Sequence, residues 1–401
     1  MTKIIVFPGS AENVFYLKEI KYISEYFDDI TVFSFSKTNK THMENSKIRI
    51  INVKFIAANI LNPHFIKWIF LKETRDEIRN VLRLNHKLKN IIYIMFYGLY
   101  YVATKKKVEL ELKKDKSNKV FLYSFWLTRG AYIISKFSHE KNVEKSISRA
   151  HGYDLYMNRS STGYLPFRNF IGNNIDEISF ISEQGKRYYA EQYSNTSALK
   201  TVHRLGTYNP GVRKIINKKN YVDIVSCSYI TEIKRIDLII ELLTELSIPY
   251  KWTHIGSGDM ETEIKQLAHK KLNNDNYVFL GNIDNKEILQ TLINIDADFL
   301  LNLSDSEGIP VSIMEALSIG VPCIARNVGG ISEIVNDDIG LLLPINFEKD
   351  MFLSLITNEL RKRIYSHDIY IDKSQKAVNF WYHNFDSEKN LRNFFYEVRN
   401  E

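Results

Sequence analysis

The sequence predicts an α/β protein of two domains, each built on a parallel, doubly wound sheet. The chain has 401 residues, of which 44% are hydrophobic, enough for two cores of ordinary size. A buried strand at 4–7, an amphipathic helix at 15–26 and a second strand at 30–35 form a βαβ opening, which is typical of a parallel sheet. After a turn-rich break at 206–211, the alternation of strand and helix begins again at 223–229.

Charge and cysteine content narrow the class of protein. Because 25% charged residues of both signs accompany 13% aromatic residues, disorder is not expected. Cys227 and Cys323 lie far apart in apolar runs, which indicates a reducing compartment and no disulfide framework. The N-terminus leads directly into the strand at 4–7 without a signal peptide, and no apolar run approaches the roughly 20 residues of a spanning helix. We expect a cytoplasmic protein, soluble or peripheral on the inner face of the membrane.

Further strands extend the first domain. Apolar runs at 48–55 and 120–126 are typical of buried strands. The turn after the first strand contains one glycine, Gly9, in place of a G-x-G-x-x-G pattern, so dinucleotide binding is not expected there. We place the first domain at 1–207 and the second at 208–373.

The basic character of the chain is concentrated in an insertion at 62–119. This insertion holds fourteen Lys or Arg and six Asp or Glu, whereas the whole chain has a net charge of +7. Arg75, Arg79, Arg83 and Lys87 recur every four residues, which predicts a basic stripe on one helix face. A charge excess that is so local indicates a partner.

An aromatic run at 90–103 follows the basic stripe and is too short to span a bilayer. Basic groups beside interfacial aromatic residues suit an anionic membrane surface or a lipid-diphosphate acceptor. A solvated helix face that covers the core is the other interpretation, and the sequence leaves both open. Nucleic acid is not expected as a partner, because no recognised nucleic-acid motif is present.

The most informative stretch of the chain is 304–344. A polar loop with Gly308 follows the apolar run 297–301, which predicts a strand that ends in a ligand-facing turn. Pro310 suits the first position of a helix that ends at Gly320. Since the first N–H groups of a helix have no intrahelical partner, this helix start predicts a phosphate site.

Two carboxylates, Glu307 and Glu315, flank the start of this helix. Beside a bound diphosphate they would accept hydrogen bonds from the hydroxyls of a ribose or a hexose, which is the chemistry of nucleotide-sugar binding. Each glutamate alone is explained more simply as a solvated residue. The prediction therefore depends on the motifs around them.

Five motifs follow one another in this part of the chain: 307–310 (EGIP), 314–317 (MEAL), 320–325 (GVPCIA), 329–333 (GGISE) and 336–342 (NDDIGLL). Together they resemble the donor-binding core of the family-four retaining glycosyltransferases, whose fold is called GT-B. The resemblance implies two Rossmann-like domains facing each other across a cleft. It also implies retention of configuration at the transferred sugar, and a terminal helix at 374–401 that returns to the first domain.

The same resemblance assigns the donor contacts. Glu307 would contact the donor sugar, Glu315 the ribose and the backbone from Pro310 the phosphates. Lys234 matches the family lysine that neutralises the diphosphate, whereas Ser228 stands where the family usually has an arginine. The donor-binding residues implied are Ser228, Lys234, Arg235, Gly256, Gly308, Ile309, Pro310, Val311, Ser312 and Glu315.

In the first domain, the resemblance points to His151, which follows a strand and precedes a glycine. In the family this position lies under the donor sugar, so His151, Lys234 and Glu307 are the expected catalytic residues. Gly9, Arg149 and Asp154 are weaker candidates on the acceptor side. Taken alone, a single histidine is more often structural than catalytic.

We therefore expect a retaining transfer of a hexose from a nucleotide-sugar to a hydroxyl of a glycan or lipid-linked glycan. The nucleotide expected in the donor is UDP. No cofactor and no metal are expected, because no Asp-x-Asp type of carboxylate pair is evident. The alternatives are a nucleotide-sugar epimerase of the same fold and a catalytically inactive relative that only binds the nucleotide-sugar. A dehydrogenase is the least favoured, since the dinucleotide pattern is missing.

Overall fold

The computed structural model describes residues 2–11, 14–36, 45–53, 60–114, 119–212 and 217–400. The chain forms two compact units. The N-terminal unit consists of Met1–His203 with Leu391–Glu401, and the C-terminal unit of Arg204–Asn390. The division thus falls after His203, whereas the sequence analysis places it after residue 207.

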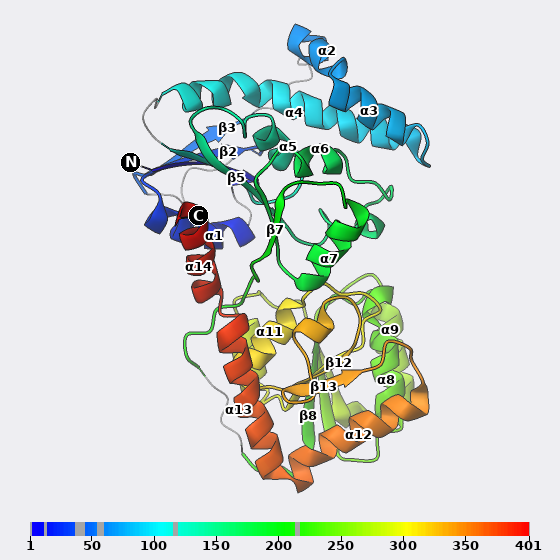
Figure 1. Ribbon diagram of the computed structural model, residues 1–401. Helices are drawn as coiled ribbons and strands as arrows, with labels where there is room; N and C mark the ends of the chain where they lie inside the picture. The colour runs from blue at the N-terminus through cyan, green and yellow to red at the C-terminus, as the bar shows by residue number, and fades with distance from the viewer. Residues whose placement is uncertain are drawn as a thin grey trace. The chain divides into compact units, whose positions relative to one another are not determined.

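A seven-stranded parallel sheet forms the centre of the N-terminal unit (Figure 1). Its order is β3-β2-β1-β4-β5-β6-β7, so the chain winds outward from β1 in both directions. The predicted strand at 48–55 is β3, which ends at Asn52, and residues 54–55 lie outside the described ranges. The strands are β1 Lys3–Gly9, β2 Asp29–Ser34, β3 Ile48–Asn52, β4 Val120–Ser124, β5 Val143–Ala150, β6 Glu177–Phe180 and β7 Leu199–Val202.

Helices cover both faces of this sheet, because successive residues of a strand point to opposite sides. Ile5 and Phe7 pack in one core with α4 and α5, whereas Ile4 and Val6 pack in another with α1 and α14. The helices are α1 Val14–Tyr26, α2 Pro63–Ile69, α3 Lys72–Val81, α4 Lys87–Lys113, α5 Arg129–Ser135, α6 Arg168–Gly172, α7 Glu183–Gln192 and α14 Ser387–Asn400.

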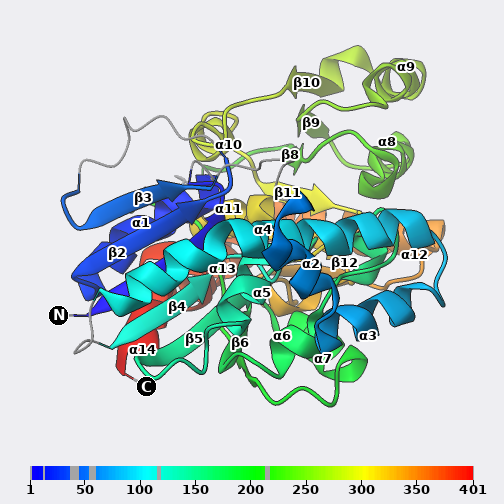
Figure 2. The same cartoon turned by 90° about the horizontal axis from the view of Figure 1, so that it is seen from above.

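The basic insertion folds as three helices, α2, α3 and α4, that lie over one side of the N-terminal unit (Figure 2). The chain turns between α3 and α4, where His86 adopts a left-handed backbone conformation with φ of 57°. Arg75 and Arg79 therefore belong to α3, Arg83 to the turn and Lys87 to α4. The prediction of one basic helix face is wrong, because the four-residue spacing spans two helices.

The aromatic run at 90–103 forms part of α4 and packs inward. Tyr97, Leu99 and Tyr101 are buried in the core shared with α5. Most of this run therefore fills the core, while Ile92 and Tyr93 stay exposed. None of the helices in the described ranges is both long and apolar enough to cross a bilayer.

A six-stranded parallel sheet forms the centre of the C-terminal unit, in the order β10-β9-β8-β11-β12-β13. This second doubly wound sheet confirms the predicted fold class. The strands are β8 Val222–Cys227, β9 Tyr250–Ile255, β10 Tyr277–Gly281, β11 Phe299–Asn302, β12 Cys323–Arg326 and β13 Gly340–Leu343. The helices are α8 Ile236–Thr244, α9 Glu261–Lys271, α10 Ile288–Asn294, α11 Val311–Ser318, α12 Lys349–Tyr365 and α13 His367–Asn384.

The C-terminal tail contains two helices where the sequence predicts one. The first, α13, buries Ala377 and Trp381 in the core of the C-terminal unit. The indole of Trp381 also donates a hydrogen bond of 2.8 Å to the hydroxyl of Thr207. The second, α14, buries Phe394 and Phe395 in the core of the N-terminal unit. The return of the chain to its first unit is therefore made by α14.

Candidate active site

The predicted donor residues come from the segments that follow the carboxyl ends of β8, β9 and β11. In a parallel sheet these ends share one edge, and β8 and β11 lie side by side at the centre. The chain leaves this pair in opposite directions along the sheet, and ligands of doubly wound sheets bind at such a switch point. A small pocket opens here, lined mainly by the ends of β8 and β11 together with Lys234.

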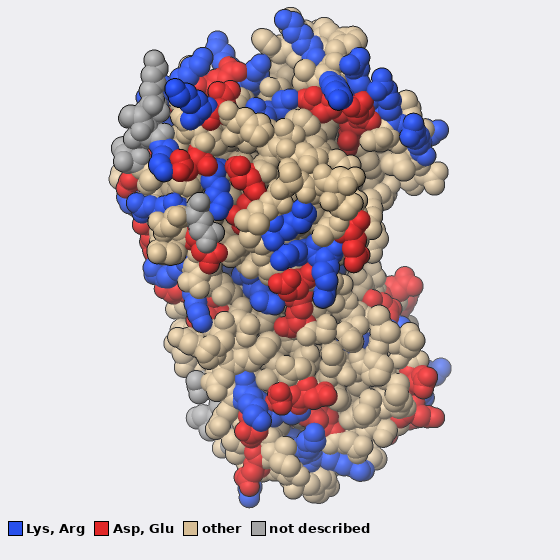
Figure 3. All heavy atoms as spheres, in the orientation of Figure 1, with Lys and Arg blue, Asp and Glu red and all other residues tan. Residues whose placement is uncertain are grey.

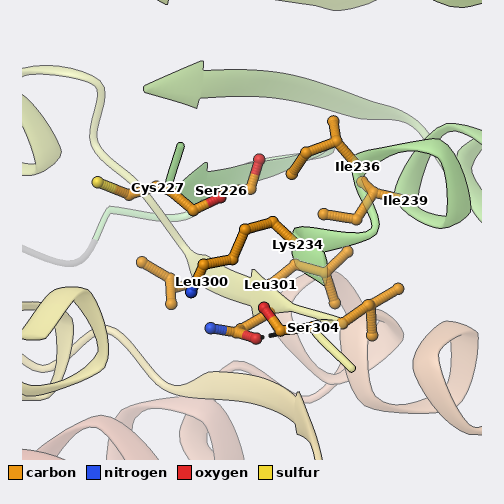
Figure 4. Close-up of a pocket in the computed structure, with 11 residues that line it drawn as sticks. Ser226, Cys227, Lys234, Ile236, Ile239, Leu300, Leu301 and Ser304 are labelled. Atoms are coloured by element: carbon orange, nitrogen blue, oxygen red, sulfur yellow. Dashed lines mark hydrogen bonds between the residues drawn. The ribbon is translucent and has the colours of Figure 1, made fainter. Parts of the chain in front are cut away.

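Lys234 and Glu307 form an ion pair at this pocket. The Nζ of Lys234 lies 2.6 Å from Oε1 of Glu307, and the amide of Asn302 donates to the same oxygen at 3.1 Å. Figure 4 shows Lys234 extended across the pocket, between Cys227 on one side and Leu300 on the other. The carboxylate is 8% exposed and the lysine 24%. A nearly buried carboxylate needs such partners, because charge is costly to remove from water.

Helix α11 begins directly beside this ion pair. Pro310 precedes it as the N-cap with φ of −67°, and its side chain provides no capping bond. Val311 is exposed and Ser312 is partly exposed, so the helix start is open to solvent and not filled by packed side chains. The first N–H groups of α11 have no intrahelical partner, and the phosphate site expected there stays a prediction.

The two glutamates lie on the same side of the sheet. Cys227, which lines the pocket with Lys234, has a pKa raised to about 12 by burial and by the negative charge of Glu315. The charge of Lys234 acts on the same thiol in the opposite direction. The charges of Glu315 and Lys234 therefore both act on one thiol of the pocket.

Glycines allow the surrounding loops to approach the site. A Cβ at Gly329, whose φ is 57°, would lie 1.9 Å from the carbonyl oxygen of Glu307. A Cβ at Gly256, whose φ is 135°, would lie 2.0 Å from the carbonyl oxygen of Ser228. Only glycine fits where a backbone comes this close and φ is positive. Gly308 takes part as well, since its carbonyl accepts a bond of 3.1 Å from the N–H of Gly330.

Arg235 has a role that the sequence analysis does not predict. Its guanidinium donates to Asp237 and to Asp305, and Asp305 is also bound by Arg326. Burial acts to raise the pKa of Asp305, but the hydrogen bond from Arg326 and the charge of Arg235 outweigh it and lower that pKa. Arg235 therefore fixes the loop after β11. Its place among the expected donor-binding residues stays a prediction.

In the N-terminal unit, His151 lies at the carboxyl end of β5 with its ring against Phe125 and Trp126, at 4.8 and 4.4 Å between centroids. Asp154 holds this corner, because its two oxygens accept from the backbone N–H groups of His151 and Leu127, both at 2.8 Å. Neither ring nitrogen of His151 has a hydrogen-bond partner among the described residues, although both are buried and Nδ1 lies 3.7 Å from Oδ2 of Asp154. Buried nitrogens without a hydrogen bond are costly and are often a functional feature.

The weaker candidates of the N-terminal unit divide into two groups. Gly9, with φ of 81°, lies next to the His151 corner, since a Cβ there would be 3.5 Å from the Trp126 ring. Arg149 is buried in an ion pair with Glu19 and donates 2.9 Å to the carbonyl of His203. Its expected place on the acceptor side is corrected, because the fold uses its guanidinium internally. Asp154 likewise positions His151 from a buried site.

Sequence reasoning overlooks three residues of these sites. Asn302 supports Glu307, and the tilted rings of Trp126 and Tyr153 lie beside His151 with 4.7 Å between their centroids. The signal was present, because Trp126 lies two residues after β4 and Asn302 is the last residue of β11. A polar or aromatic residue that ends a parallel strand faces the ligand edge of the sheet.

Comparison with known proteins agrees with this geometry. The family model described as "Glycosyl transferases group 1" matches residues 212–376. These residues belong to that family. The match contains the pocket, α11 and all five predicted motifs, so the resemblance drawn from 304–344 is confirmed. The expected class of enzyme, a transferase of sugar groups, agrees with this match.

Named relatives cover different shares of the chain. The N-acetyl-alpha-D-glucosaminyl L-malate synthase of Bacillus anthracis is 26% identical over 184 residues, which are 44% of this chain and 45% of that protein. The uncharacterized glycosyltransferase MJ1178 of Methanocaldococcus jannaschii is 25% identical over 80% of this chain and 86% of its own length. The amylovoran biosynthesis glycosyltransferase AmsK of Erwinia amylovora is 31% identical over 30% of this chain and 32% of its own length. The match thus spans less than half of two of these three relatives.

Solved structures share the fold of this chain over its whole length. WaaB, a lipopolysaccharide outer core galactosyltransferase, has a TM-score of 0.69 at 14% identity, with 99% of both chains covered. HepE of Anabaena, solved in complex with UDP and glucose, has a TM-score of 0.63 at 14% identity, with both chains fully covered. The predicted GT-B class of fold is therefore confirmed.

Proposed function

We propose that this group 1 glycosyltransferase moves a hexose from UDP to a hydroxyl of a glycan or lipid-linked glycan, with retention of configuration. The observation that carries the proposal is the ion pair of Lys234 with Glu307 at the start of α11. A cation, a carboxylate and the start of a helix lie together here, which supports the binding of a diphosphate beside sugar hydroxyls. The solved relatives HepE and TarM, both in complex with UDP, support UDP as the nucleotide. The amylovoran enzyme supports a glycan acceptor.

The proposed mechanism depends on where charge develops. As the bond between the sugar and the diphosphate breaks, negative charge grows on the leaving phosphate oxygens. The N–H groups at the start of α11 and the Nζ of Lys234 would stabilise this charge, which is usually the largest contribution of such a site. Glu307, held by Asn302, would accept hydrogen bonds from the sugar hydroxyls, and Glu315 from those of the ribose.

The N-terminal unit would contribute the other contacts. His151 has two buried ring nitrogens able to bind a sugar hydroxyl, and Asp154 fixes its backbone. Trp126 and Tyr153 offer aromatic faces against which a sugar ring can stack. We assign His151 to the transferred sugar and the two aromatic residues to the acceptor.

The test is the turnover of the Lys234→Ala variant, measured as transfer of labelled hexose from UDP to a lipid or glycan extract. Turnover should fall by roughly 100-fold or more, as is usual when a group that stabilises transition-state charge is removed. Lys271→Ala is the matched control, because Lys271 is an exposed lysine of the same unit at the end of α9. Normal turnover in Lys234→Ala would contradict the assignment.

Two other functions remain as alternatives with their own outcomes in this assay. An epimerase would convert the UDP-hexose without an acceptor, whereas a transferase would not. An inactive relative would bind the donor and never consume it, and Ser228 in place of the usual arginine favours this alternative. Among the described residues, no group of three or more His, Cys, Asp or Glu is placed to hold a metal. Metal independence stays a prediction, which turnover in the presence of EDTA would test.

A further inference from the structure

Exposed apolar side chains are concentrated on residues 60–93, which we call the α2–α4 face. In the described part of the chain, 24 large apolar residues are exposed, and nine of them belong to this short segment. Leu61, Phe70 and Leu88 are 82%, 68% and 72% exposed. Such a concentration on a soluble surface marks an interaction site. The nine residues are Ile60, Leu61, Ile66, Phe70, Leu82, Leu84, Leu88, Ile92 and Tyr93.

The charges displayed on the same face are basic. All seven of its Lys and Arg residues are exposed: Lys67, Lys72, Arg75, Arg79, Arg83, Lys87 and Lys89. Of its three acidic residues, Glu73 pairs with Lys136, and Glu77 accepts hydrogen bonds from Tyr164 and Phe167 of the same unit. Asp76, the third, pairs with Arg79. The outward charge is therefore strongly positive.

Apolar and basic residues alternate most closely at residues 82–89, the turn between α3 and α4. This tip reads LRLNHKLK, and every one of its residues is exposed. It projects from the end of the α3–α4 pair (Figure 1). In Figure 3, this end of the molecule shows Lys and Arg side chains among uncharged residues. Leucines with interleaved basic groups suit the boundary between headgroups and acyl chains.

The helices beneath the face are held firmly by the core. Phe65 and Trp68 of α2 are buried, and the indole of Trp68 donates 2.7 Å to the hydroxyl of Tyr132. Gly98 of α4 permits this approach, because a Cβ there would lie 2.3 Å from the Trp68 ring. The exposed side chains are thus displayed on a fixed scaffold, so docking requires little ordering of the backbone.

We propose that the α2–α4 face docks on the surface of an anionic lipid bilayer, with the leucines of the tip entering the interface. Seven like charges oppose the stacking of a second copy on this face and complement acidic headgroups. The apolar residues are interleaved with basic ones and extend over three helices, as in interfacial membrane binders. This inference goes beyond the proposed transfer reaction and does not depend on it.

Sedimentation of the full chain with vesicles tests the proposal. One set of vesicles contains phosphatidylglycerol and phosphatidylcholine, and the other only phosphatidylcholine. The charge variant is Arg83→Gln/Lys87→Gln/Lys89→Gln, and its control, Lys141→Gln/Arg187→Gln/Lys271→Gln, removes three exposed charges elsewhere. The apolar variant is Leu84→Ser/Leu88→Ser, and its control is Leu199→Ser, an exposed leucine on β7.

Wild type should sediment with the anionic vesicles alone, and less at high salt. The charge variant should lower the partition coefficient by about 100-fold, since each basic group near the surface contributes about 1 kcal/mol. The apolar variant should lower it by about tenfold or more. Both controls should sediment as wild type does, and all variants should keep the circular dichroism and melting temperature of wild type.

Three outcomes would overturn the proposal. The wild type does not sediment with anionic vesicles, it sediments equally with neutral ones, or the tip variants sediment no less than their controls. A concentration-dependent dimer that Leu84→Ser/Leu88→Ser abolishes, without any vesicle binding, would assign the face to a second copy. Because turnover on a soluble acceptor is measured separately, a failure here leaves the transferase proposal standing.

Discussion

His254 is a buried residue next to the pocket, because it contacts Ser226, which lines the pocket. It is buried in β9, and its Nδ1 lies 2.8 Å from the hydroxyl of Ser226. The indole of Trp252 donates to the hydroxyl of Ser226 at 3.0 Å. Burial lowers the pKa of His254 to about 4, so its imidazole is neutral at pH 7. A neutral ring with its proton on Nε2 accepts the proton of Ser226 at Nδ1.

The lowered pKa makes the stability of the protein dependent on pH. Between about pH 6.5 and pH 4 the unfolded chain binds a proton at this position and the folded protein does not, so acid favours unfolding. Lowering the pH from 7 to 5 should cost about 2 kcal/mol of unfolding free energy through His254. The measurement is urea unfolding at both pH values in wild type and in His254→Gln, which should lose this increment. An equal pH dependence in both proteins would contradict the assignment.

The family resemblance nominates Lys234, Glu307 and Glu315, because each matches a motif residue; Lys234 and Glu307 follow strand ends, and Glu315 lies in α11. Residue type and spacing are not sufficient to assign the arginines. Arg149 follows the same strand pattern as His151, yet a buried glutamate 130 positions earlier in the chain takes up its charge. Such distant pairings leave no local signal in a sequence, so only the fold could reveal that Arg149 is structural.

At the scale of elements, the site is an arrangement of loops that glycine brings into contact. The loop after β12 presses against the loop after β11 at Gly329 and Gly330, where the carbonyl groups of Glu307 and Gly308 lie against their backbone. This contact fixes the carboxylate of Glu307 relative to the start of α11. The orientation of the proposed sugar-binding group is thus set by backbone packing.

Replacing Gly329 by alanine should separate these loops. The new Cβ would meet the carbonyl of Glu307 at 1.9 Å, so the loop must shift and UDP-hexose affinity should fall by at least about tenfold, equivalent to about 1.4 kcal/mol. Gly281→Ala is the matched control, because Gly281 also has a positive φ, 69°, but nothing within 4 Å of its Cβ. Calorimetric titration measures both variants. An equal loss of affinity in the two would show that strain, and not loop contact, is responsible.

Helices and strands can be predicted from the sequence where apolar residues recur with one regular spacing. They cannot be predicted where the chain turns within such a spacing. The strands and the α11 unit follow from apolar runs bounded by glycine and proline. The four-residue spacing of Arg75, Arg79, Arg83 and Lys87 resembles one helix equally well, because sequence periodicity alone does not show that α3 ends at Val81. The sequence of 90–103 likewise does not show that its aromatic residues fill the core shared with α5.

At the scale of the whole molecule, two doubly wound units share one chain that returns to its start. The last helix, α14, fills the face of the N-terminal sheet next to α1 with Leu391, Phe394 and Phe395. Length, composition and the repeated βα rhythm predict the two units. The amphipathic pattern of the tail predicts only that a helix buries one of its faces. The family resemblance is needed to predict that this face packs against the first unit.

The central claim, that the edge of the C-terminal sheet between β8 and β11 binds a nucleoside diphosphate sugar, is tested most directly by titrating UDP into the full chain in a calorimeter. Wild type should bind, and Glu315→Ala should bind at least about tenfold more weakly, since a hydrogen-bonded charge at the ribose is lost. Glu263→Ala, at an exposed glutamate of α9, should match wild type. Absence of UDP binding by wild type, or unchanged affinity in Glu315→Ala, would contradict the account.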